Sequence, residues 1–527
     1  MTPEDWIAHD PDPTTAAELA ACAPDELAAR FARPLTFGTA GLRGPVRGGP
    51  DAMNLAVVLR ATWAVAHVLT RRGLAGAPVI VGRDARHGSA AFGAAAAEVL
   101  AAEGFSVLQL PGPVPTPIVA FAVRHTGAAA GIQITASHNP PADNGYKVYF
   151  DGGMQIISPT DREIEAAMSA APPADQIART HVQPADTGLV ELYIERASAV
   201  RRTGGSIRVA LTPLHGVGGA VAVETLRRAG FDDVHTVASQ FAPDPDFPTV
   251  AFPNPEEPGA SEALLGLAAD VGADIAIALD PDADRCAVGI PTAHGWRMLS
   301  GDETGWLLGD YILQHPHAET PVVASTVVAS TVVSSRMLAA IARQYHAVHV
   351  ETPTGFKWLA RADASQPGTL VYAYEEAIGH CVDPAAVRDK DGISAAVLVC
   401  DLVGALHAEG RSVPDQLDQL ARRHGVHEVA AVSRPVTNAD EAAASMQRLR
   451  TAPPGPLAGF TITDVADALV FTDSHSDTSA RVVVRPSGTE PKLKCYFEVR
   501  CAATDDLGPA RERARALIDE LVSAVSS

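Results

Sequence analysis

The sequence is poor in cysteine and in aromatic residues, and it has no long apolar run. Six cysteines are scattered over 527 residues, with neither CxxC spacing nor histidines at metal-ligand spacing, which predicts reduced, mostly buried thiols. No uninterrupted apolar run reaches the roughly 20 residues that a membrane helix needs, and residues 1–11 lack the apolar core of a signal peptide. We therefore expect a cytoplasmic protein.

Basic residues are also in deficit. The chain carries 41 Lys and Arg against 62 Asp and Glu, a formal net charge of −21. Nucleic acids and anionic membranes are bound by clustered Lys and Arg, so this balance argues against both as partners. Because salt screens exposed charges beyond about 8 Å, one small cationic site is still compatible with the acidic surface. The charge balance therefore does not argue against a small anionic substrate, and a monomer or a homodimer is expected.

What the chain has in quantity is short apolar runs separated by Ala-rich helical segments. At a usual size of ~150 residues per domain, 527 residues suggest three or four domains. Alternating strands and helices predict parallel strand pairing with helical crossovers. This alternation forms three similar units before residue 430. The expected fold class is α/β, with three related α/β domains built on mixed sheets and a smaller C-terminal α+β domain. The expected boundaries are 1–200, 201–310, 311–430 and 431–527.

The pattern predicts these elements along the chain. Helices are expected at 14–31, 54–70, 88–103, 218–229, 261–271, 334–345, 356–362, 440–450 and 505–523. Strands are expected at 77–81, 105–110, 131–135, 206–211, 234–237, 275–279, 322–327, 347–351, 370–374, 468–472, 480–484 and 492–499.

The segment TASHNP at residues 135–140 places Ser137 directly after a predicted strand. Ligand chemistry in open α/β folds gathers at the ends of such strands, and His138 could orient Ser137 or relay its proton. A polar turn ended by proline explains the same residues, and the segment alone favours that interpretation.

The segment DPDADR places Asp280, Asp282 and Asp284 at i, i+2 and i+4 after an apolar strand. At ~4 Å and an effective dielectric near 20, each pair of like charges costs about 4 kcal/mol, so a cation should offset the repulsion. Carboxylate oxygens suit Mg²⁺, which often keeps positions for water or phosphate. A solvated acidic turn is the alternative, and the preceding strand and the following Arg285 favour the metal.

A third segment, RPSGTEPK at residues 485–492, could cradle a phosphate with Arg485, Ser487, Gly488 and Thr489. An ordinary Pro/Gly turn is about equally compatible. Weaker candidates are the loop FGTAGLRG with Arg43, the loop EEAIGH with Glu376, and three isolated positions that are more typical of surface turns: Lys147, Gly355 and Lys390.

Taken together and in this order, FGTAGLRG, TASHNP, DPDADR, the EExxG loop and RPSGTEPKLK resemble the α-D-phosphohexomutase superfamily of phosphoglucomutases and phosphomannomutases. The stretches at 212–219, 252–260 and 389–392 are similar to the branch that also includes phosphopentomutases and glucose-1,6-bisphosphate synthases. The resemblance spans nearly the whole chain. It implies four domains around a central cleft, the fourth of them mobile.

The resemblance also implies a role for each of these candidate residues. Ser137 would be the phosphorylated serine, and Asp280, Asp282 and Asp284 would hold Mg²⁺ together with its oxygen. Arg43 and Arg285 would lie near the transferred phosphoryl group, with His138 and Lys147 as alternative proton-handling groups. Glu376 and the loop at Gly355 would contact the sugar, and Arg485, Ser487, Gly488 and Thr489, helped by Lys390, would hold the other phosphate.

The implied activity is the interconversion of glucose 1-phosphate and glucose 6-phosphate, with the mannose phosphates as further substrates. It would run through a phosphoserine and a bisphosphorylated sugar, so glucose 1,6-bisphosphate is the expected activator beside Mg²⁺. Many hexose-phosphate members carry Glu-x-Ser in the sugar loop, whereas Ala377 and Ile378 follow Glu376 here. A phosphopentomutase acting on ribose 1-phosphate and ribose 5-phosphate, or a glucose-1,6-bisphosphate synthase, therefore remains as an alternative.

Overall fold

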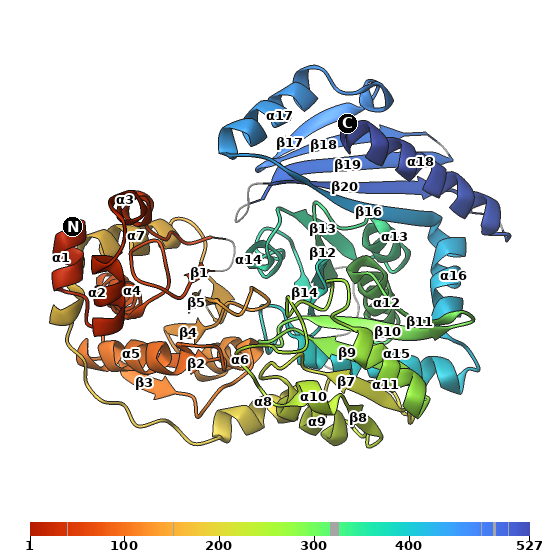
Figure 1. Ribbon diagram of the computed structural model, residues 1–527. Helices are drawn as coiled ribbons and strands as arrows, with labels where there is room; N and C mark the ends of the chain where they lie inside the picture. Colours follow the sequence, from red (N-terminus) through yellow and green to blue (C-terminus); the bar gives the residue numbers. More distant parts are fainter. Residues whose placement is uncertain are drawn as a thin grey trace. The chain divides into compact units, whose positions relative to one another are not determined.

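The computed structural model describes residues 1–38, 41–150, 152–316, 326–475, 477–487, 492–503 and 505–526 (Figure 1). The chain divides into two compact units, which are described separately. The first unit comprises Met1–Leu299 and Ala377–Ala405, and the second comprises Ser300–Glu376 and Leu406–Ser527. Four separate sheets, two before residue 300 and two after it, form the cores of four domains.

Domain I is built on a mixed sheet with the strand order β1-β5-β4-β2-β3, to which β6 is added beside β5. Its strands are β1 (Leu42–Pro45), β2 (Pro78–Arg83), β3 (Ser106–Gln109), β4 (Ala130–Ile134), β5 (Asp143–Phe150) and β6 (Met154–Gln155). Its helices are α1 (Pro3–Ala8), α2 (Pro13–Ala20), α3 (Pro24–Ala32), α4 (Leu55–Arg71), α5 (Ser89–Ala102), α6 (Thr116–Thr126), α7 (Thr160–Ala170) and α8 (Gly188–Ser198), with a 3₁₀ turn at Ala174–Gln176. Strand β2 runs parallel to β3 and β4, whereas β5 is antiparallel to β4 and β1.

Helices pack on both faces of this sheet because side chains alternate along its strands. Val79 and Val81 of β2 join the apolar cluster formed with α4 and α5. On the other face α6 lies so close that a Cβ at Gly131 would come within 2.4 Å of Val123. Such a burial of both faces explains why the strands read as short continuous apolar runs rather than as alternating ones.

Domain II has the strand order β11-β10-β9-β7-β8. Its strands are β7 (Val209–Thr212), β8 (Val234–Thr236), β9 (Ile275–Leu279), β10 (Cys286–Thr292) and β11 (Gly295–Met298), and its helices are α9 (Gly219–Arg228), α10 (Ala238–Phe241) and α11 (Glu262–Val271). Strand β9 is entirely buried and ends directly before Asp280. Because β9 and β10 form an antiparallel pair, residues 280–285 make the turn that joins them.

Domain III has a parallel core in the order β13-β12-β14. Its elements are α12 (Gly301–Gln314), β12 (Thr326–Thr331), α13 (Met337–Gln344), β13 (Val348–Thr352), α14 (Phe356–Leu359), β14 (Thr369–Glu375), β15 (Gly379–Cys381), α15 (Gly392–Ala408) and α16 (Val413–His424). The chain passes from the second unit into the first directly after Glu376 and returns within α15. The EEAIGH loop therefore contributes Glu376 to one unit and Ile378 to the other.

Domain IV is an antiparallel sheet in the order β16-β20-β19-β18-β17. Its strands are β16 (Val426–Pro435), β17 (Thr461–Val465), β18 (Ala468–Ser474), β19 (Thr478–Pro486) and β20 (Lys492–Cys501), with α17 (Ala439–Thr451), a 3₁₀ turn at Gly455–Leu457 and α18 (Gly508–Ser526). Side chains of α17 and α18 pack against one apolar cluster, so both helices cover the same face (Figure 1). The other face packs Val470 and Val483 against Val332 and Val333 of domain III.

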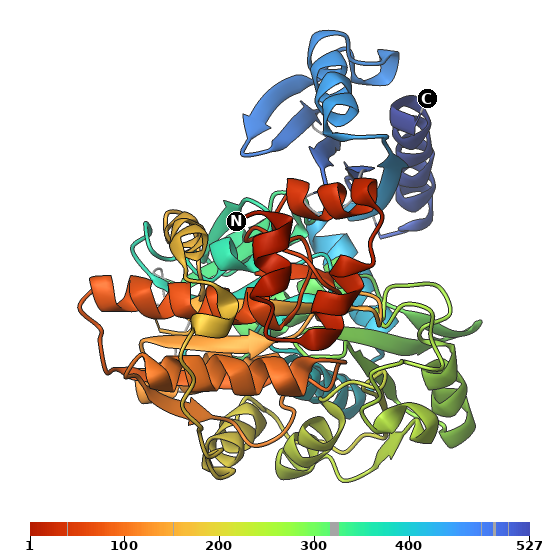
Figure 2. The same ribbon diagram turned by 60° about the vertical axis from the view of Figure 1, so that its left-hand side comes forward.

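The architecture confirms the predicted fold class, because three α/β domains are followed by a smaller C-terminal domain with an antiparallel sheet. The single helix predicted at residues 14–31 is wrong, because the chain forms α2 and α3 there, and these pack with α1 as separate short helices (Figure 2). Pro24 has no N–H and keeps Ala23 in an extended conformation with ψ 148°, so α2 cannot continue into α3. The helix predicted from residue 334 begins at Met337, and most of the strand predicted at 322–327 lies outside the described residues.

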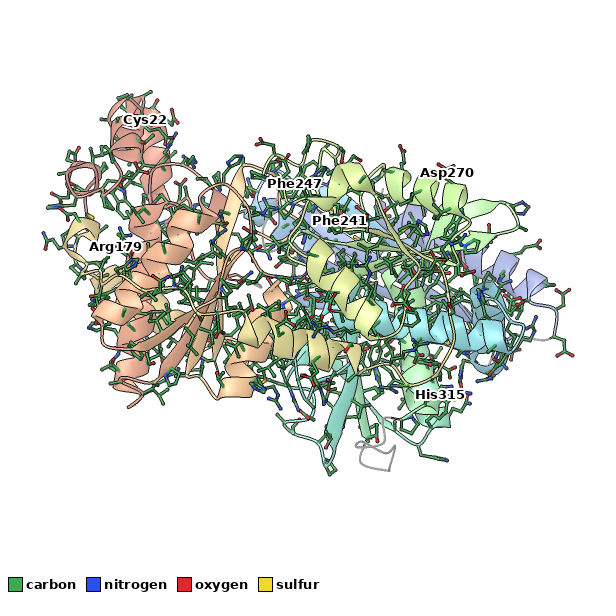
Figure 3. The ribbon with its side chains drawn as sticks, turned by 90° about the horizontal axis from the view of Figure 1, so that it is seen from below. Cys22, Arg179, Phe241, Phe247, Asp270 and His315 are labelled. Carbon is green, nitrogen blue, oxygen red and sulfur yellow. The ribbon has the colours of Figure 1, made fainter. Side chains whose placement is uncertain are left out.

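The cysteines conform to the prediction of free thiols. All six are free; five are buried, and Cys22 lies half-buried between α2 and α3 (Figure 3). Within the described residues no single helix is long and apolar enough to span a membrane, although α15 and α16 together would pass on length and composition.

Candidate active site

Ser137 lies three residues beyond the end of β4, in a buried turn of the first unit. Its backbone adopts φ 53°, in the left-handed region that non-glycine residues rarely enter. Its amide donates to Thr135 Oγ1 at 2.9 Å, and its hydroxyl donates to Asp280 Oδ2 at 2.7 Å and lies 3.2 Å from His138 Nδ1. The turn thus holds the serine hydroxyl between a carboxylate and an imidazole.

The metal loop, which we define as residues 280–285, follows the buried strand β9. Asp280, Asp282 and Asp284 are all buried, and each offers an oxygen within 4.8 Å of the others. Ala283, at φ 55°, turns the chain between the last two carboxylates. The spacing of two residues therefore does bring the three side chains to one point, as the sequence predicts.

Two lysines face this cluster. Lys147 of β5 donates to Asp282 Oδ2 at 2.7 Å and to Asp284 Oδ2 at 2.8 Å. Lys390 lies 3.2 Å from the same oxygen of Asp284. The family resemblance places Lys390 with the phosphate cradle of residues 485–489, whereas in the structure its ammonium group pairs with the metal loop.

The carboxylate cluster fits a divalent cation. Among the described residues, no hydrogen-bond donor reaches Oδ1 of Asp282 or Oδ1 of Asp284, although both atoms are buried. Burial and the charges of the two neighbouring aspartates raise the pKa of Asp280 well above its usual value. A bound cation would reverse this effect, because it favours the ionised carboxylate. Hard oxygen ligands at this spacing suit Mg²⁺.

The two proton-handling candidates differ in charge. Burial, together with Arg285 and Arg43, lowers the pKa of His138 well below its usual value, so its imidazole is neutral at neutral pH. Burial alone would lower the pKa of Lys147, but the carboxylates of Asp282 and Asp284 raise it. Of the two, only His138 is uncharged, and its Nδ1 lies 3.2 Å from the Ser137 hydroxyl oxygen.

The predicted arginines lie beside these groups. Arg43 of β1 donates through Nη1 to Asn139 Oδ1 at 3.2 Å, which ties the FGTAGLRG loop to the turn of Ser137. Gly41 in that loop has φ 94°, and a Cβ there would lie 2.3 Å from the carbonyl oxygen of Tyr146, so only glycine permits the approach. Arg285 donates its amide to Asp280 Oδ1 at 3.1 Å and its Nη1 to the carbonyl of Ala377 at 3.2 Å.

Two residues that the sequence analysis did not single out complete the site. Thr116, the first residue of α6, donates its hydroxyl to Asp282 Oδ2 at 2.5 Å and its amide to the Asp282 carbonyl at 2.9 Å. Arg86 donates to backbone carbonyls in the turn of Ser137. Arg86 follows the end of β2, a strand of the same parallel set, and this position was the signal available in the sequence.

The remaining predicted residues belong to the second unit. Glu376 accepts through Oε2 from Thr331 Oγ1 and Ser334 Oγ, both at 3.2 Å. Gly355, at φ 109°, precedes the short helix α14. Arg485 Nη2 donates to Asp467 Oδ2 at 3.1 Å, and the amide of Ser487 donates to the Lys492 carbonyl at 2.8 Å. Gly488 and Thr489 lie outside the described residues.

Four family models, one for each domain of phosphoglucomutase/phosphomannomutase, match successive segments of the chain. The α/β/α domains I, II and III match residues 34–174, 191–293 and 300–424, and the C-terminal domain matches residues 434–510. The chain belongs to the phosphoglucomutase/phosphomannomutase family. Members of this family are phosphomutases, and the resemblance inferred from the motifs is thereby confirmed.

Similar proteins carry several substrate names within this family. A Haemophilus influenzae protein named "Probable phosphomannomutase" is 37% identical over 470 residues, which cover 85% of this chain and 93% of the relative. The Homo sapiens phosphopentomutase is 33% identical and covers 95% of this chain and 90% of its own. The chain also superposes on a crystal structure that carries the name phosphomannomutase, from Thermus thermophilus, with a TM-score of 0.69 and 25% identity. The superposition covers 92% of this chain and 99% of the Thermus chain.

Proposed function

We propose that the protein interconverts glucose 1-phosphate and glucose 6-phosphate, and the corresponding mannose phosphates, through a phosphorylated Ser137. One observation carries the proposal: the Ser137 hydroxyl donates to Asp280 at 2.7 Å and lies 3.2 Å from the imidazole of His138, beside a buried carboxylate cluster. A serine is a weak nucleophile at neutral pH and needs a base and a cation nearby, and this turn offers places for both.

In the first half-reaction the phosphoryl group leaves Ser137 Oγ and forms a bond to a hydroxyl oxygen of the sugar phosphate, which gives a bisphosphate. In the second, Ser137 Oγ attacks the other phosphate, the bond between that phosphorus and the sugar oxygen breaks, and the isomer is released. In the first half-reaction the attacking sugar hydroxyl gives up its proton and the leaving Ser137 Oγ gains one. In the second, the serine proton passes to His138 Nδ1, and the departing sugar oxygen gains a proton in exchange. Glucose 1,6-bisphosphate is therefore the expected activator.

The residues around Ser137 position and stabilise charge, which is the main requirement of phosphoryl transfer. Asp280, Asp282 and Asp284 would hold Mg²⁺, which neutralises charge on the transferred group when it is bound. Arg43 and Arg285 supply fixed positive charge at the same place. Lys147 and Lys390 offset the charge of the aspartates and keep the carboxylates oriented.

A second set of residues would hold the sugar and the phosphate that stays in place. Thr331 and Ser334 grip Oε2 of Glu376, so Oε1 is free of these two hydroxyls to accept a sugar hydroxyl. Arg485 and Ser487, with Gly488 and Thr489, supply a phosphate-binding turn of the kind that guanidinium and hydroxyl donors form. Gly355 would place the domain III loop against the sugar.

A pentose phosphate is the second candidate substrate. The human relative is named phosphopentomutase, and Ile378 stands where hexose-phosphate mutases often have serine. Comparing kcat/KM for ribose 1-phosphate with that for glucose 1-phosphate and mannose 1-phosphate decides between them. A net accumulation of glucose 1,6-bisphosphate would instead indicate a bisphosphate synthase.

The phosphoserine is tested with Ser137→Ala. The variant should lose turnover with every sugar phosphate and should take up no labelled phosphoryl group from glucose 1,6-bisphosphate in the presence of Mg²⁺. Ser335→Ala is the matched control, because Ser335 is a buried serine that donates to a buried carboxylate, Glu498, at 2.6 Å. The control should lose stability but still be phosphorylated. Turnover by Ser137→Ala at the wild-type rate would contradict the proposal.

A further inference from the structure

Arg86 binds the turn of Ser137 through its guanidinium group, which is almost entirely buried. Nη2 donates to the carbonyls of Ser137 and Asn139 at 2.7 and 2.6 Å, and Nη1 donates to those of Pro140 and Asp143 at 2.7 and 3.2 Å. The two terminal nitrogens carry four hydrogens, so four backbone carbonyls use all of them. A planar fork with this many partners fixes the turn in one conformation.

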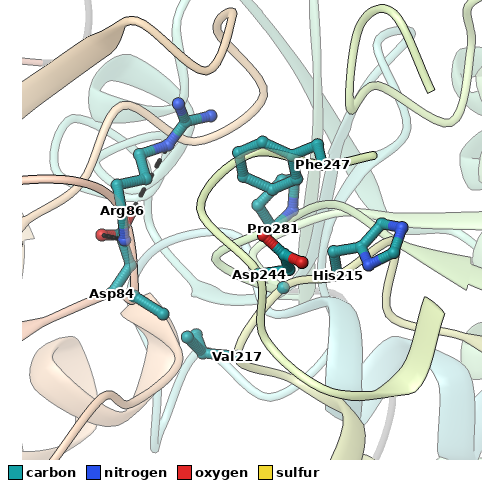
Figure 4. Close-up of a pocket in the computed structure, with 9 residues that line it drawn as sticks. Asp84, Arg86, His215, Val217, Asp244, Phe247 and Pro281 are labelled. Atoms are coloured by element: carbon teal, nitrogen blue, oxygen red, sulfur yellow. Dashed lines mark hydrogen bonds and ion pairs between the residues drawn. The ribbon is translucent and has the colours of Figure 1, made fainter. Parts of the chain in front are cut away.

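The guanidinium itself is held from two sides. Asp84 Oδ1 accepts from the backbone amide of Arg86 at 2.9 Å and from Ser89 Oγ at 2.5 Å, and Asp84 Oδ2 lies 3.5 Å from Arg86 Nε. On the opposite side, the ring of Phe247 faces the guanidinium with 4.9 Å between its centroid and Cζ (Figure 4). Arginine stacks favourably on such aromatic faces.

Phe247 belongs to domain II and is connected to the metal loop by a short series of backbone hydrogen bonds. The loop that bears it is tied to His215, whose carbonyl accepts from the amide of Asp244 at 2.9 Å. Val217, two residues after His215, donates its amide to the carbonyl of Pro281 in the metal loop at 2.8 Å. A small cavity lies where Arg86, Phe247 and Pro281 meet. Arg86 therefore touches the serine turn directly and reaches the metal loop through Phe247.

We propose that Arg86 is a positioning residue that sets the distance between the Ser137 hydroxyl and the carboxylates of the metal loop. It does not touch the reacting atoms. Its four carbonyl contacts hold Ser137 at its left-handed φ, and its contact with Phe247 ties that turn to the loop that carries Asp280. This inference rests on the proposed function, because it assigns to Arg86 the geometry in which Ser137 reacts.

The test is Arg86→Lys, which keeps the charge but cannot reach four carbonyls, because an ammonium group presents its donors from a single point. The variant should take up a labelled phosphoryl group at Ser137 from glucose 1,6-bisphosphate about 10²-fold more slowly, since a misplacement of about 1 Å can have that effect. The Mg²⁺ concentration for half-maximal rate should rise, because the loop and the serine turn share the metal. The KM for glucose 1-phosphate should change little.

Arg60 provides a matched control in the same domain. Its guanidinium is also buried, donates to the carbonyls of Met168, Ala171 and Pro172, and lies 5.8 Å from the ring centroid of Trp6. Arg60→Lys removes the same type of structural contact at a distance from Ser137. It should lower the thermal midpoint as Arg86→Lys does, while leaving the phosphorylation rate and the Mg²⁺ requirement at the wild-type values.

The outcomes separate the two proposals. If the wild-type protein takes up no phosphoryl group at Ser137, the proposed function fails, and the inference about Arg86 fails with it. If the wild type is phosphorylated and Arg86→Lys reacts at the same rate with the same Mg²⁺ requirement, only the inference fails. It also fails if Arg60→Lys slows the reaction as much as Arg86→Lys does, since a general loss of stability would then explain both.

Discussion

Ile378 shows that a residue's place in a motif and its place in the fold can suggest different roles. It occupies the position where related enzymes often carry a serine, and this suggests a change in the sugar site. In the structure its side chain is buried with Ala210, Ala276 and Ala287 in the apolar cluster of domain II. A core contact therefore explains the apolar residue at least as well as a change of substrate does.

Asp302 supplies a prediction at the same scale. Burial raises its pKa to about 7, while its Oδ1 accepts from the amide of Ser335 and the hydroxyl of Tyr374, both at 2.8 Å. The folded protein thus keeps this carboxyl protonated where the unfolded chain ionises it. The stability of the folded state falls as the pH rises from about 4 to about 7, and the gap between the two pKa values corresponds to about 4 kcal/mol.

Asp302→Asn imitates the protonated carboxyl and should remove this dependence. The unfolding free energy of the variant relative to the wild type should rise by about 2–3 kcal/mol between pH 5 and pH 8. Urea unfolding at the two pH values measures it. Asp270→Asn is the control, because Asp270 is exposed near the end of α11 (Figure 3), and it should show no such rise. A difference between Asp302→Asn and wild type that does not change with pH would show that Asp302 is ionised in the folded protein.

At the scale of elements, the site is assembled by turns at strand ends. The turn after β4 carries Ser137, and the turn after β9 carries the three aspartates. A third turn, after β7, supports the second one: a Cβ at Gly216 would lie 2.3 Å from Cα and 2.4 Å from the carbonyl oxygen of Pro281. Backbone atoms at this distance have to move, because they have no alternative rotamer.

Gly216→Ala should therefore displace the metal loop. We expect at least about 10²-fold slower turnover and weaker activation by Mg²⁺, since both depend on the placement of the carboxylates. Gly266→Ala is the control, because a Cβ at that helical glycine would meet open space. The control should be as active as the wild type and more stable by about 0.5–1 kcal/mol. Full activity of Gly216→Ala would mean that the metal loop tolerates the shift.

The elements were predictable where one local signal was sufficient. The sequences of strands β2 and β9 are short apolar runs because these strands are buried on both faces of their sheets. Strand β5 was not predicted, because Asn144 and Gly145 suggest a turn, and only pairing with β1 and β4 makes it a strand. As a result, Lys147 was recognised through the family resemblance and not through a strand that would place it.

At the scale of the molecule, domains III and IV are joined by ion pairs as well as by apolar contacts. Arg481 of β19 makes two hydrogen bonds to Glu351 of β13, at 2.8 and 2.9 Å. Nearby, Glu498 of β20 accepts from Arg336 Nε at 2.8 Å and lies 2.8 Å from His427 Nδ1. Burial alone would raise the pKa of Glu498, but these hydrogen bonds and charges hold it well below its usual value.

The pair of Arg481 and Glu351 can be measured by a double-mutant cycle with Arg481→Met and Glu351→Gln. Bidentate guanidinium–carboxylate pairs are among the stronger polar contacts, so we expect a coupling free energy of about 1–2 kcal/mol in urea unfolding of domain IV. The exposed pair of Arg228 and Glu191, with 2.7 Å between Nη2 and Oε2, is the control and should show a much smaller coupling free energy, because solvent screens exposed charges. Equal coupling in the two pairs would show that Arg481 does not help to hold domain IV on domain III.

The sequence by itself determined the fold class, the family, the three aspartates and the phosphorylation candidate, because strand periodicity and long ordered motifs are local properties of the chain. Only the tertiary structure decided which distant groups meet: Arg86 with the turn of Ser137, Thr116 with Asp282, Lys390 with Asp284, and Ile378 with the core of domain II. Such contacts join residues between 51 and 168 positions apart. They depend on strand order and turn geometry, which no segment of the chain encodes alone.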